Sequence, residues 1–181
     1  DEATFYGPKI DIQFKNVYGR EETMSTIQLD FAAKSRFNLR YFDKEGNVNN
    51  EVFVIHRAPL STHERFLAFL IEHYKGKLPL WLNPIQIKII TVNDRNVKFA
   101  NEVKKELEKN NIRVELDDRS ETISKKVLDA YKLMPNYIIT IGDKETKNKI
   151  LAVRDRSNKV KFGVKLNAFI KSLLKDIKNK R

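Results

Sequence analysis

The sequence has no cysteine among its 181 residues and only three histidines. Disulfide bonds, thiolate zinc sites and cysteine nucleophiles are therefore excluded together. No apolar run approaches the ~20 residues that a membrane-spanning helix needs. The first residues show neither the basic nor the apolar part of a signal peptide. With 41% hydrophobic residues, the composition predicts a soluble, cytoplasmic protein with one or two modest cores and no membrane partner.

Positive charge is abundant and unevenly distributed. The chain carries 35 Lys and Arg against 24 Asp and Glu, a net charge of +11. Residues 1–84 hold 11 of each sign, so residues 85–181, with 24 basic and 13 acidic side chains, carry the whole excess. The last segment, 144–181, is the most basic, with 13 basic and 3 acidic side chains. This imbalance favours either a polyanionic partner such as nucleic acid or a lysine-rich, solvated surface.

Two prolines, Pro79 and Pro84, predict a domain boundary, because proline removes a backbone donor and interrupts helices and central strands. We therefore divide the chain into domains 1–83 and 84–181. In the first domain, alternation of apolar and polar residues predicts strands, and a later helical periodicity predicts a helix. The expected strands are 10–14, 26–31, 40–42 and 52–55, with a hairpin turn at 45–47 and the helix around 66–74. This is an α+β domain in which the last strand of an antiparallel sheet leads into a helix.

The second domain alternates strands and helices in the order βαβαββα. The expected strands are 85–92, 112–116, 137–141, 150–154 and 159–162, and the helices lie around 99–107, 123–134 and 166–177. Such an order predicts a mostly parallel sheet flanked by helices, with an antiparallel edge. The fold class of the whole chain is therefore α/β.

The densest site-like cluster is the segment 55–66, IHRAPLSTHERF. A strand leads into it and a helix follows, so anions are favoured at the helix start. Arg65 lies in the first helical turn, where its flat guanidinium can stack on a base and bind phosphate oxygens. An ordinary capped helix, with Thr62 as the N-cap, explains the same residues. His56 alone favours a core side chain over a metal ligand, since a catalytic zinc needs about three protein ligands.

Two further segments could border a ligand pocket. Residues 5–9, FYGPK, combine an aromatic ring, a cation and a turn, although such turns also occur as plain strand entries. In the strand 27–31, Gln28 and Asp30 share one face, which is either the floor of a ligand site or a solvated surface.

These motifs together resemble the C-terminal part of the threonyl-tRNA synthetases, a family of class II aminoacyl-tRNA synthetases. The matching stretches are FYGPKID, TIQLDF, VIHRAPLSTHERF, PLWLNPIQI, and IGDKE with LAVRDR. Residues 55–66 resemble class II motif 3, and 84–181 resemble the anticodon-binding domain of the class IIa group. The resemblance implies ATP-dependent activation of threonine and its transfer to tRNA.

The resemblance also implies roles for individual residues. Arg65 would stack on the adenine of ATP, which binds with Mg²⁺, and His56 would be one of three ligands of a zinc ion (Zn²⁺) that holds threonine. Tyr6, Lys9 and Gln28 would line or approach the amino-acid pocket. In the second domain, the anticodon bases would be contacted by Ser120, Glu145 and Arg154.

The chain also departs from the family pattern. Ser61 and Ser120 stand where glycine and asparagine are usual, and Glu22-Thr23 replaces a Trp-Gln pair that contributes an ATP contact. Motifs 1 and 2, two zinc ligands and the editing domain have no counterpart in the sequence. We therefore expect part of a threonine–tRNA ligase, a homodimer when complete, that does not activate threonine by itself.

Two other functions remain open. One is a non-catalytic RNA-binding paralogue that retains the anticodon-binding domain. The other is an unrelated α/β nucleotide-binding protein, which is disfavoured because no glycine-rich phosphate loop follows an expected strand.

Overall fold

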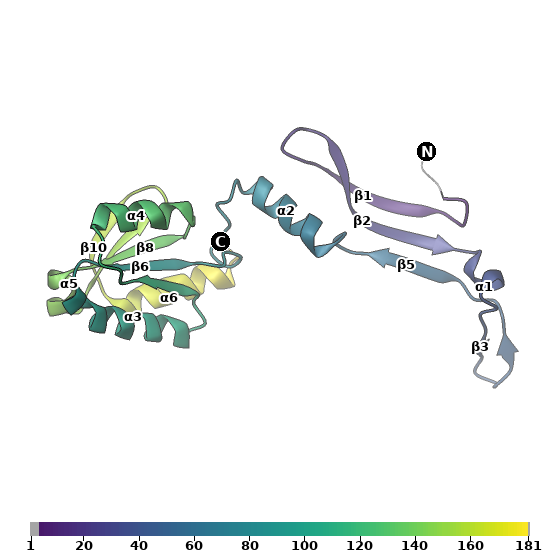
Figure 1. Cartoon of the computed structure of the whole chain (residues 1–181). Coiled ribbons are helices and arrows are strands. Elements are labelled where there is room, and N and C mark those ends of the chain that lie inside the picture. The colour runs from purple at the N-terminus through teal and green to yellow at the C-terminus, as the bar shows by residue number, and fades with distance from the viewer. Residues whose placement is uncertain (1–3, 181) are drawn as a thin grey trace. The chain divides into compact units, whose positions relative to one another are not determined.

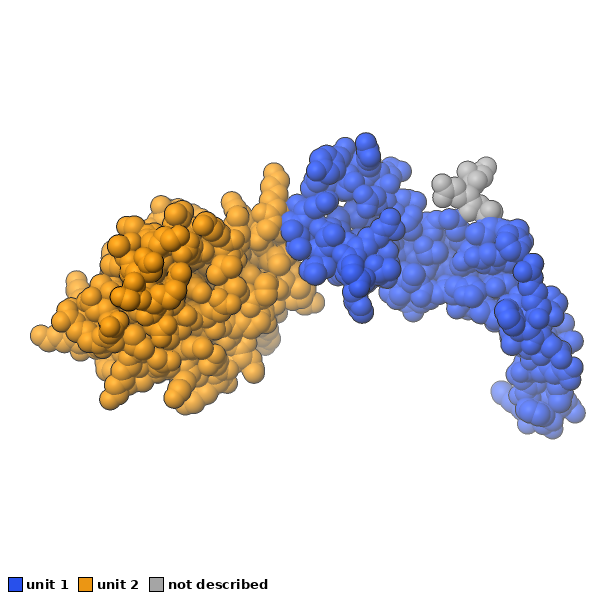
Figure 2. Space-filling view, in the orientation of Figure 1, with its two compact units in different colours: residues 1–73 blue, residues 74–181 orange. Residues whose placement is uncertain are grey.

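The computed structural model describes residues 4–180 of the chain. It divides into two compact units, residues 1–73 and residues 74–181, which Figure 2 colours separately. Within residues 4–180, no helix has both the length and the apolar character needed to cross a membrane.

The first unit is built on a three-stranded antiparallel sheet in the order β1-β2-β5 (Figure 1). Its strands are β1 (Lys9–Lys15), β2 (Glu21–Asp30) and β5 (Val54–Ala58), and β5 is followed by helix α2 (His63–His73). A short helix and a separate two-stranded hairpin lie between β2 and β5: α1 (Ala33–Arg36), β3 (Tyr41–Phe42) and β4 (Val48–Asn49). The prediction of an antiparallel sheet whose last strand leads into a helix is confirmed.

The sheet of the first unit has one polar and one apolar face. On the apolar face, Ile10, Ile12 and Ile55 have exposed fractions of 66%, 58% and 64%. Helix α2 contacts this side of the unit through Phe69, whose ring centroid lies 3.9 Å from that of Phe14, yet no residue of α2 is buried. The alternation in the sequence therefore segregates the two faces, as expected for a strand, but most of the apolar face has no cover among the described residues.

The second unit contains a five-stranded mixed sheet in the order β10-β9-β8-β6-β7. Its elements are β6 (Ile87–Thr91), a 3₁₀ turn η1 (Asp94–Asn96), α3 (Val97–Lys109), β7 (Val114–Asp117), α4 (Ile123–Lys132), β8 (Tyr137–Ile141), α5 (Asp143–Asn148), β9 (Leu151–Asp155), β10 (Val160–Val164) and α6 (Leu166–Lys178). Strand β6 pairs parallel with β7 and β8, whereas β9 pairs antiparallel with β8 and β10. The expected antiparallel edge is thus the β9–β10 hairpin.

Helices cover both faces of this sheet. Apolar residues of α3 and α6, such as Val103 and Leu173, pack with Ile89 and Ile139 in the main core. On the opposite face, Ala130 of α4 packs with Ile90 and Ile138 in a smaller cluster. Figure 1 shows α4 on one side of the sheet and α3 and α6 on the other, which is the three-layer arrangement typical of α/β domains.

Two helices differ from the sequence-based expectation. The six-residue helix α5, DKETKN, was missed because it has no buried residue and no apolar periodicity. It forms because the carboxylate of Glu145 accepts a hydrogen bond from the backbone N–H of Gly142, at 3.1 Å, and so caps the helix start. The four-residue helix α1 was also missed; there the carboxylate of Asp30 accepts hydrogen bonds from the N–H groups of Ala32 and Ala33.

The segment 74–83, which the sequence analysis assigned to the first domain, is hydrogen-bonded to the second unit. Arg156 donates to three backbone carbonyls: that of Leu78 at 2.6 Å, that of Met134 at 2.7 Å and that of Pro135 at 3.1 Å. Arg113 likewise donates to the carbonyl of Trp81 at 2.9 Å. Side chains distant in the sequence therefore hold this segment in place.

Replacing Arg156 with alanine is expected to destabilise the second unit by roughly 2–4 kcal/mol, because three carbonyls lose a charged donor at once. Urea unfolding followed by the fluorescence of Trp81, which lies in the segment that Arg156 holds, measures the effect. The control Lys161→Ala, at an exposed position of β10, should change stability by less than about 0.5 kcal/mol. Equal midpoints for Arg156→Ala and the control would contradict this account.

Candidate functional site

The polar face of the first unit contains a cavity of about 390 Å³. It is lined by residues of the turn before β1, of β1 and β2, of the end of β5 and the loop after it, and of the start of α2: Thr4, Tyr6, Lys9, Asp11, Thr23, Met24, Thr26, Gln28, Ala58, Ser61 and Arg65. Strand register explains this gathering, because Lys9 is paired with Gln28 and Asp11 with Thr26 across β1 and β2. Four residues singled out in the sequence, Tyr6, Lys9, Gln28 and Arg65, thus meet in one cavity.

A hydrogen-bonded chain orients the amide of Gln28. The hydroxyl of Tyr6 donates to its Oε1 at 3.0 Å, and its Nε2 donates to the hydroxyl of Thr4 at 2.8 Å. The amide is therefore fixed in one orientation at the wall of the cavity.

Lys9 and Asp11 form an ion pair beside this amide. The ammonium of Lys9 lies 2.8 Å from Oδ2 of Asp11, and the hydroxyl of Thr26 donates to Oδ1 at 2.7 Å. These two donors, Lys9 foremost, hold the pKa of Asp11 below its usual value. The cavity wall thus carries both a cation and an ionised carboxylate.

His56 lies next to this group but does not line the cavity. Its Nε2 is 3.0 Å from Oδ2 of Asp30, and its ring centroid is 6.3 Å from that of Tyr6. The hydrogen bond with His56 is the main reason that the pKa of Asp30 is lowered, with the backbone N–H groups of Ala33 and Ala32 adding to it.

The residues around His56 do not form a metal site by themselves. His56 and Asp30 supply two ligands, and a protein-bound zinc needs at least three. Within residues 4–180, no group of three or more His, Asp or Glu side chains could hold a metal ion. Zinc therefore does not fit the described residues alone, and no chemical step below depends on it.

The start of α2 places Arg65 at the cavity. The side-chain hydroxyl of Thr62 accepts a hydrogen bond from the N–H of Arg65 at 3.3 Å. Thr62 therefore caps the helix, as expected from the sequence if the segment is an ordinary capped helix. The guanidinium of Arg65 is exposed and has no hydrogen-bond acceptor within residues 4–180. Ser61, just before the cap, adopts the left-handed conformation (φ 56°), where glycine is unstrained. The segment is therefore both a capped helix and a carrier of a free cation.

In the second unit, the three predicted tRNA contacts lie in different places. Ser120, in the loop between β7 and α4, borders a cavity of about 410 Å³ together with Arg95, Arg119 and Lys126. Glu145 caps α5. Arg154, on β9, borders a separate cavity of about 250 Å³. The structure does not bring these three side chains into a common cavity.

Two residues beside Ser120 were not identified from the sequence. Arg119 bridges Asp117 at 2.6 Å and Asp129 at 3.1 Å, which secures the loop that carries Ser120. Lys126 is only 2% exposed, and its ammonium donates to the carbonyl of Thr91 at 2.8 Å. A lysine on an amphipathic helix normally faces solvent, so no sequence signal marks this buried one.

The ion pairs around Asp129 predict a pH-dependent stability. Lys125, followed by Arg119, lowers the pKa of Asp129 to about 2. A carboxylate whose pKa is lower in the folded state stabilises the fold above the unfolded pKa of 3.8, and this contribution is lost as pH falls toward 2. The variant Asp129→Asn should therefore lose less stability than the wild type between pH 4 and pH 2.

Urea midpoints measured across this pH range test the prediction. Glu121→Gln is the control, since the carboxylate of Glu121 has no ion-pair partner among residues 4–180. If the urea midpoints of wild type and Asp129→Asn change in parallel with pH, the ion pairs of Asp129 add nothing to stability.

Comparisons with known proteins agree with this organisation. Residues 1–74 match the family of the tRNA synthetase class II core domain (G, H, P, S and T), and residues 86–176 match the anticodon binding domain family. A threonine–tRNA ligase of Clostridium perfringens is 44% identical over 180 residues, which are 99% of this chain and 28% of that protein. A threonine–tRNA ligase catalytic subunit of Sulfurisphaera tokodaii is 43% identical over 99% of this chain and 33% of its own length.

A solved structure shows the same fold. The RNA binding domain of threonyl-tRNA synthetase from Cryptosporidium parvum superposes with a TM-score of 0.81 at 35% identity, covering 97% of this chain and 44% of that one. The chain thus spans about a third or less of the curated relatives described above. The chain belongs to the threonyl-tRNA synthetase family, in which it comprises the C-terminal part of a class II core domain and the anticodon-binding domain.

Proposed function

We propose that this chain is part of a threonine–tRNA ligase, which activates threonine with ATP and transfers it to its tRNA. The observation that carries the proposal is the cavity in which Tyr6, Lys9, Gln28 and Arg65 meet. Its wall offers an amide in a fixed orientation, an ion pair and a free guanidinium, groups suited to a zwitterionic amino acid next to a nucleotide. The relatives named threonine–tRNA ligase support the choice of threonine.

In this proposal, the residues of the cavity act mainly by binding and positioning. Tyr6 and Gln28 orient the amino acid, and Lys9 contributes positive charge near its carboxylate. Arg65 stacks on the adenine and holds phosphate oxygens, with Mg²⁺ bound to ATP supplying further charge neutralisation. Positioning and charge stabilisation of this kind account for most of the rate enhancement in such reactions.

We further propose that His56 serves as one ligand of a zinc ion whose remaining ligands come from outside these 181 residues. The same holds for the rest of the active site, since the chain spans only 28% of the Clostridium perfringens relative. Residues 1–181 alone are therefore expected to be inactive in threonine activation. The complete enzyme is proposed to be a cytoplasmic homodimer.

The second unit is proposed to bind tRNA. Its family is that of anticodon-binding domains, and residues 85–181 carry the whole net charge of +11. Contacts to phosphates by Lys and Arg make binding weaken as salt concentration rises. Ser120, Glu145 and Arg154 are the residues proposed to face the anticodon.

Threonine-dependent ATP–pyrophosphate exchange tests the proposal. The full-length gene product should catalyse the exchange with threonine and not with valine, whereas purified residues 1–181 should bind tRNA without catalysing it. Binding of tRNA by a full-length product that shows no exchange would instead identify the non-catalytic RNA-binding paralogue.

A further inference from the structure

Asn158 connects helix α4 to strand β9 through one side-chain oxygen. Its Oδ1 accepts a hydrogen bond from the hydroxyl of Tyr131 at 2.6 Å and a second one from Nη1 of Arg154. Tyr131 lies near the end of α4, and Asn158 lies in the turn of the β9–β10 hairpin. The three side chains thus form a bridge across one face of the sheet.

The hairpin turn does not need this side chain for its own structure. Oδ1 of Asp155 accepts hydrogen bonds from the N–H groups of Ser157 at 2.9 Å and Lys159 at 3.0 Å. The N–H of Asn158 donates to the carbonyl of Asp155 at 3.0 Å. The turn requires only that residue 158 adopt the left-handed conformation (φ 67°), which asparagine and glycine both tolerate. The Oδ1 of Asn158 is therefore available for another purpose.

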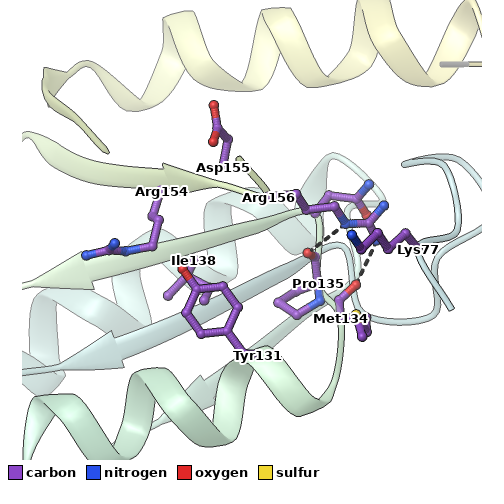
Figure 3. A pocket seen from close by; sticks show the side chains of 9 residues that line it. Lys77, Tyr131, Met134, Pro135, Ile138, Arg154, Asp155 and Arg156 are labelled. Atoms are coloured by element: carbon purple, nitrogen blue, oxygen red, sulfur yellow. Dashed lines mark hydrogen bonds between the residues drawn. The ribbon is translucent and has the colours of Figure 1, made fainter. Parts of the chain in front are cut away.

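Arg154 borders a cavity of about 250 Å³ whose other walls combine apolar side chains with charged ones, among them Asp155 and Arg156. Figure 3 shows the ring of Tyr131 beside Ile138 and Pro135, with Arg154 on one side and Arg156 on the other. The two arginines differ in their partners. Arg156 is held by three backbone carbonyls, whereas Arg154 bonds to Asn158 and has no carboxylate partner within residues 4–180.

A neutral acceptor has a specific consequence for Arg154. A carboxylate would orient the guanidinium but would also neutralise much of its charge, whereas an amide oxygen orients it and leaves the charge available. An arginine that is already ordered loses less side-chain entropy when it binds a ligand. Its remaining N–H groups suit a pair of acceptor oxygens or nitrogens, such as a nucleobase edge or a phosphate group.

We propose that Asn158, supported by Tyr131, is a positioning residue that holds the Arg154 guanidinium ready for contact with tRNA beside this cavity. The inference rests on the proposed function, because tRNA is taken as the ligand. It assigns to the β9–β10 turn a part in RNA recognition that follows from hydrogen bonding rather than from the positive charge of the segment.

The first experiment examines Arg154 in the free protein and needs no RNA. Side-chain ¹⁵N NMR of residues 1–181 should show separate, slowly exchanging Nη signals for Arg154, since its guanidinium is hydrogen-bonded. Asn158→Gly, which keeps the turn, should merge these signals, and Asn158→Asp, which keeps an acceptor oxygen, should preserve them. Freely rotating Arg154 signals in the wild type would overturn the proposal.

The second experiment measures binding of two transcripts, a threonine tRNA and the same tRNA with a changed anticodon. Asn158→Gly should weaken binding of the threonine tRNA by about threefold to tenfold, the range expected when one long side chain must be ordered on binding. Tyr131→Phe should weaken it less, and the control Ser172→Ala, at an exposed position of α6, should leave it unchanged. In an Arg154→Ala background, Asn158→Gly should have no further effect.

The possible outcomes separate the positioning role from the proposed function. Additive losses from Asn158→Gly and Arg154→Ala, or no loss from Asn158→Gly, would overturn the positioning role. Non-additive losses that are confined to the threonine tRNA support the positioning role and identify a nucleobase as the group that Arg154 contacts. Equal non-additive losses on both transcripts also support the positioning role but identify a phosphate as the contacted group. If the full-length product binds neither transcript while the NMR result holds, the proposed tRNA binding fails, whereas the ordered state of Arg154 stands.

Discussion

Replacing Arg65 with alanine is expected to lower the rate of threonine-dependent ATP–pyrophosphate exchange by the full-length protein at least about 100-fold. The guanidinium of Arg65 lines the cavity of the first unit and has no acceptor within residues 4–180. It is thus an exposed cation at the cavity, open to an anionic ligand. In the proposed function, that ligand is ATP, and in the variant the phosphates lose one protein counter-charge for the charge that develops during adenylate formation.

Two further variants make this prediction specific. Arg65→Lys keeps the charge but removes the planar group that stacks and binds two oxygens, so a loss of more than about tenfold is expected there as well. Arg40→Ala is the matched control, because Arg40 is exposed in the same unit and, among residues 4–180, donates only to the side chain of Asn38. If Arg65→Ala and Arg40→Ala give the same exchange rate, Arg65 has no role in activation and the motif 3 assignment is wrong.

Replacing Gly7 with alanine is expected to destabilise the sheet of the first unit by about 3 kcal/mol or more. Gly7 has a φ of +154°, and a Cβ added there would lie 2.0 Å from the carbonyl oxygen of Leu29. The backbones are this close because the N–H of Leu29 donates to the carbonyl of Pro8 at 3.0 Å, and that of Phe31 donates to the carbonyl of Tyr6 at 2.9 Å. An alanine must push these segments apart and so displace Tyr6 from Gln28.

Amide hydrogen exchange measures this effect within the chain. In Gly7→Ala, the amides of Leu29 and Phe31 should exchange at least about 100-fold faster, while Ile89 in the second unit keeps its wild-type rate. Gly19→Ala is the control for the backbone conformation alone, since Gly19 also has a positive φ (75°) but nothing within 4 Å of the added Cβ. Its cost should stay near 1–2 kcal/mol. Similar exchange rates in both variants would show that the close contact at Gly7 is relieved without cost.

Much of the candidate site in the first unit could be predicted from the sequence. Alternation along the strands places Gln28 and Asp30 on one face, and the turn at Gly7-Pro8 places Tyr6 and Lys9 next to the first strand. The meeting of these residues with Arg65 depends on strand register, which pairs Lys9 with Gln28. Register depends on long-range pairing rather than on local periodicity, so the sequence analysis named four residues that line the cavity but not the cavity itself.

The site in the second unit could be predicted only in part. Positive charge and the motif residues Ser120, Glu145 and Arg154 were identified from the sequence, but their separation in space was not. The bridge from Tyr131 through Asn158 to Arg154 joins a helix to a hairpin turn. Nothing local in either segment indicates that contact, since a turn asparagine is explained by its left-handed backbone alone.

The sequence by itself determined the two-part organisation, the α/β fold class and the concentration of positive charge in residues 85–181. These properties follow from composition and from hydrophobic periods that extend over a few residues. The tertiary structure alone decided which polar groups became partners: His56 with Asp30, Arg156 with three carbonyls, and Asn158 with Tyr131 and Arg154. Apart from Asn158 with Arg154, these pairs join segments far apart in the chain, because only the fold brings such segments within hydrogen-bond distance.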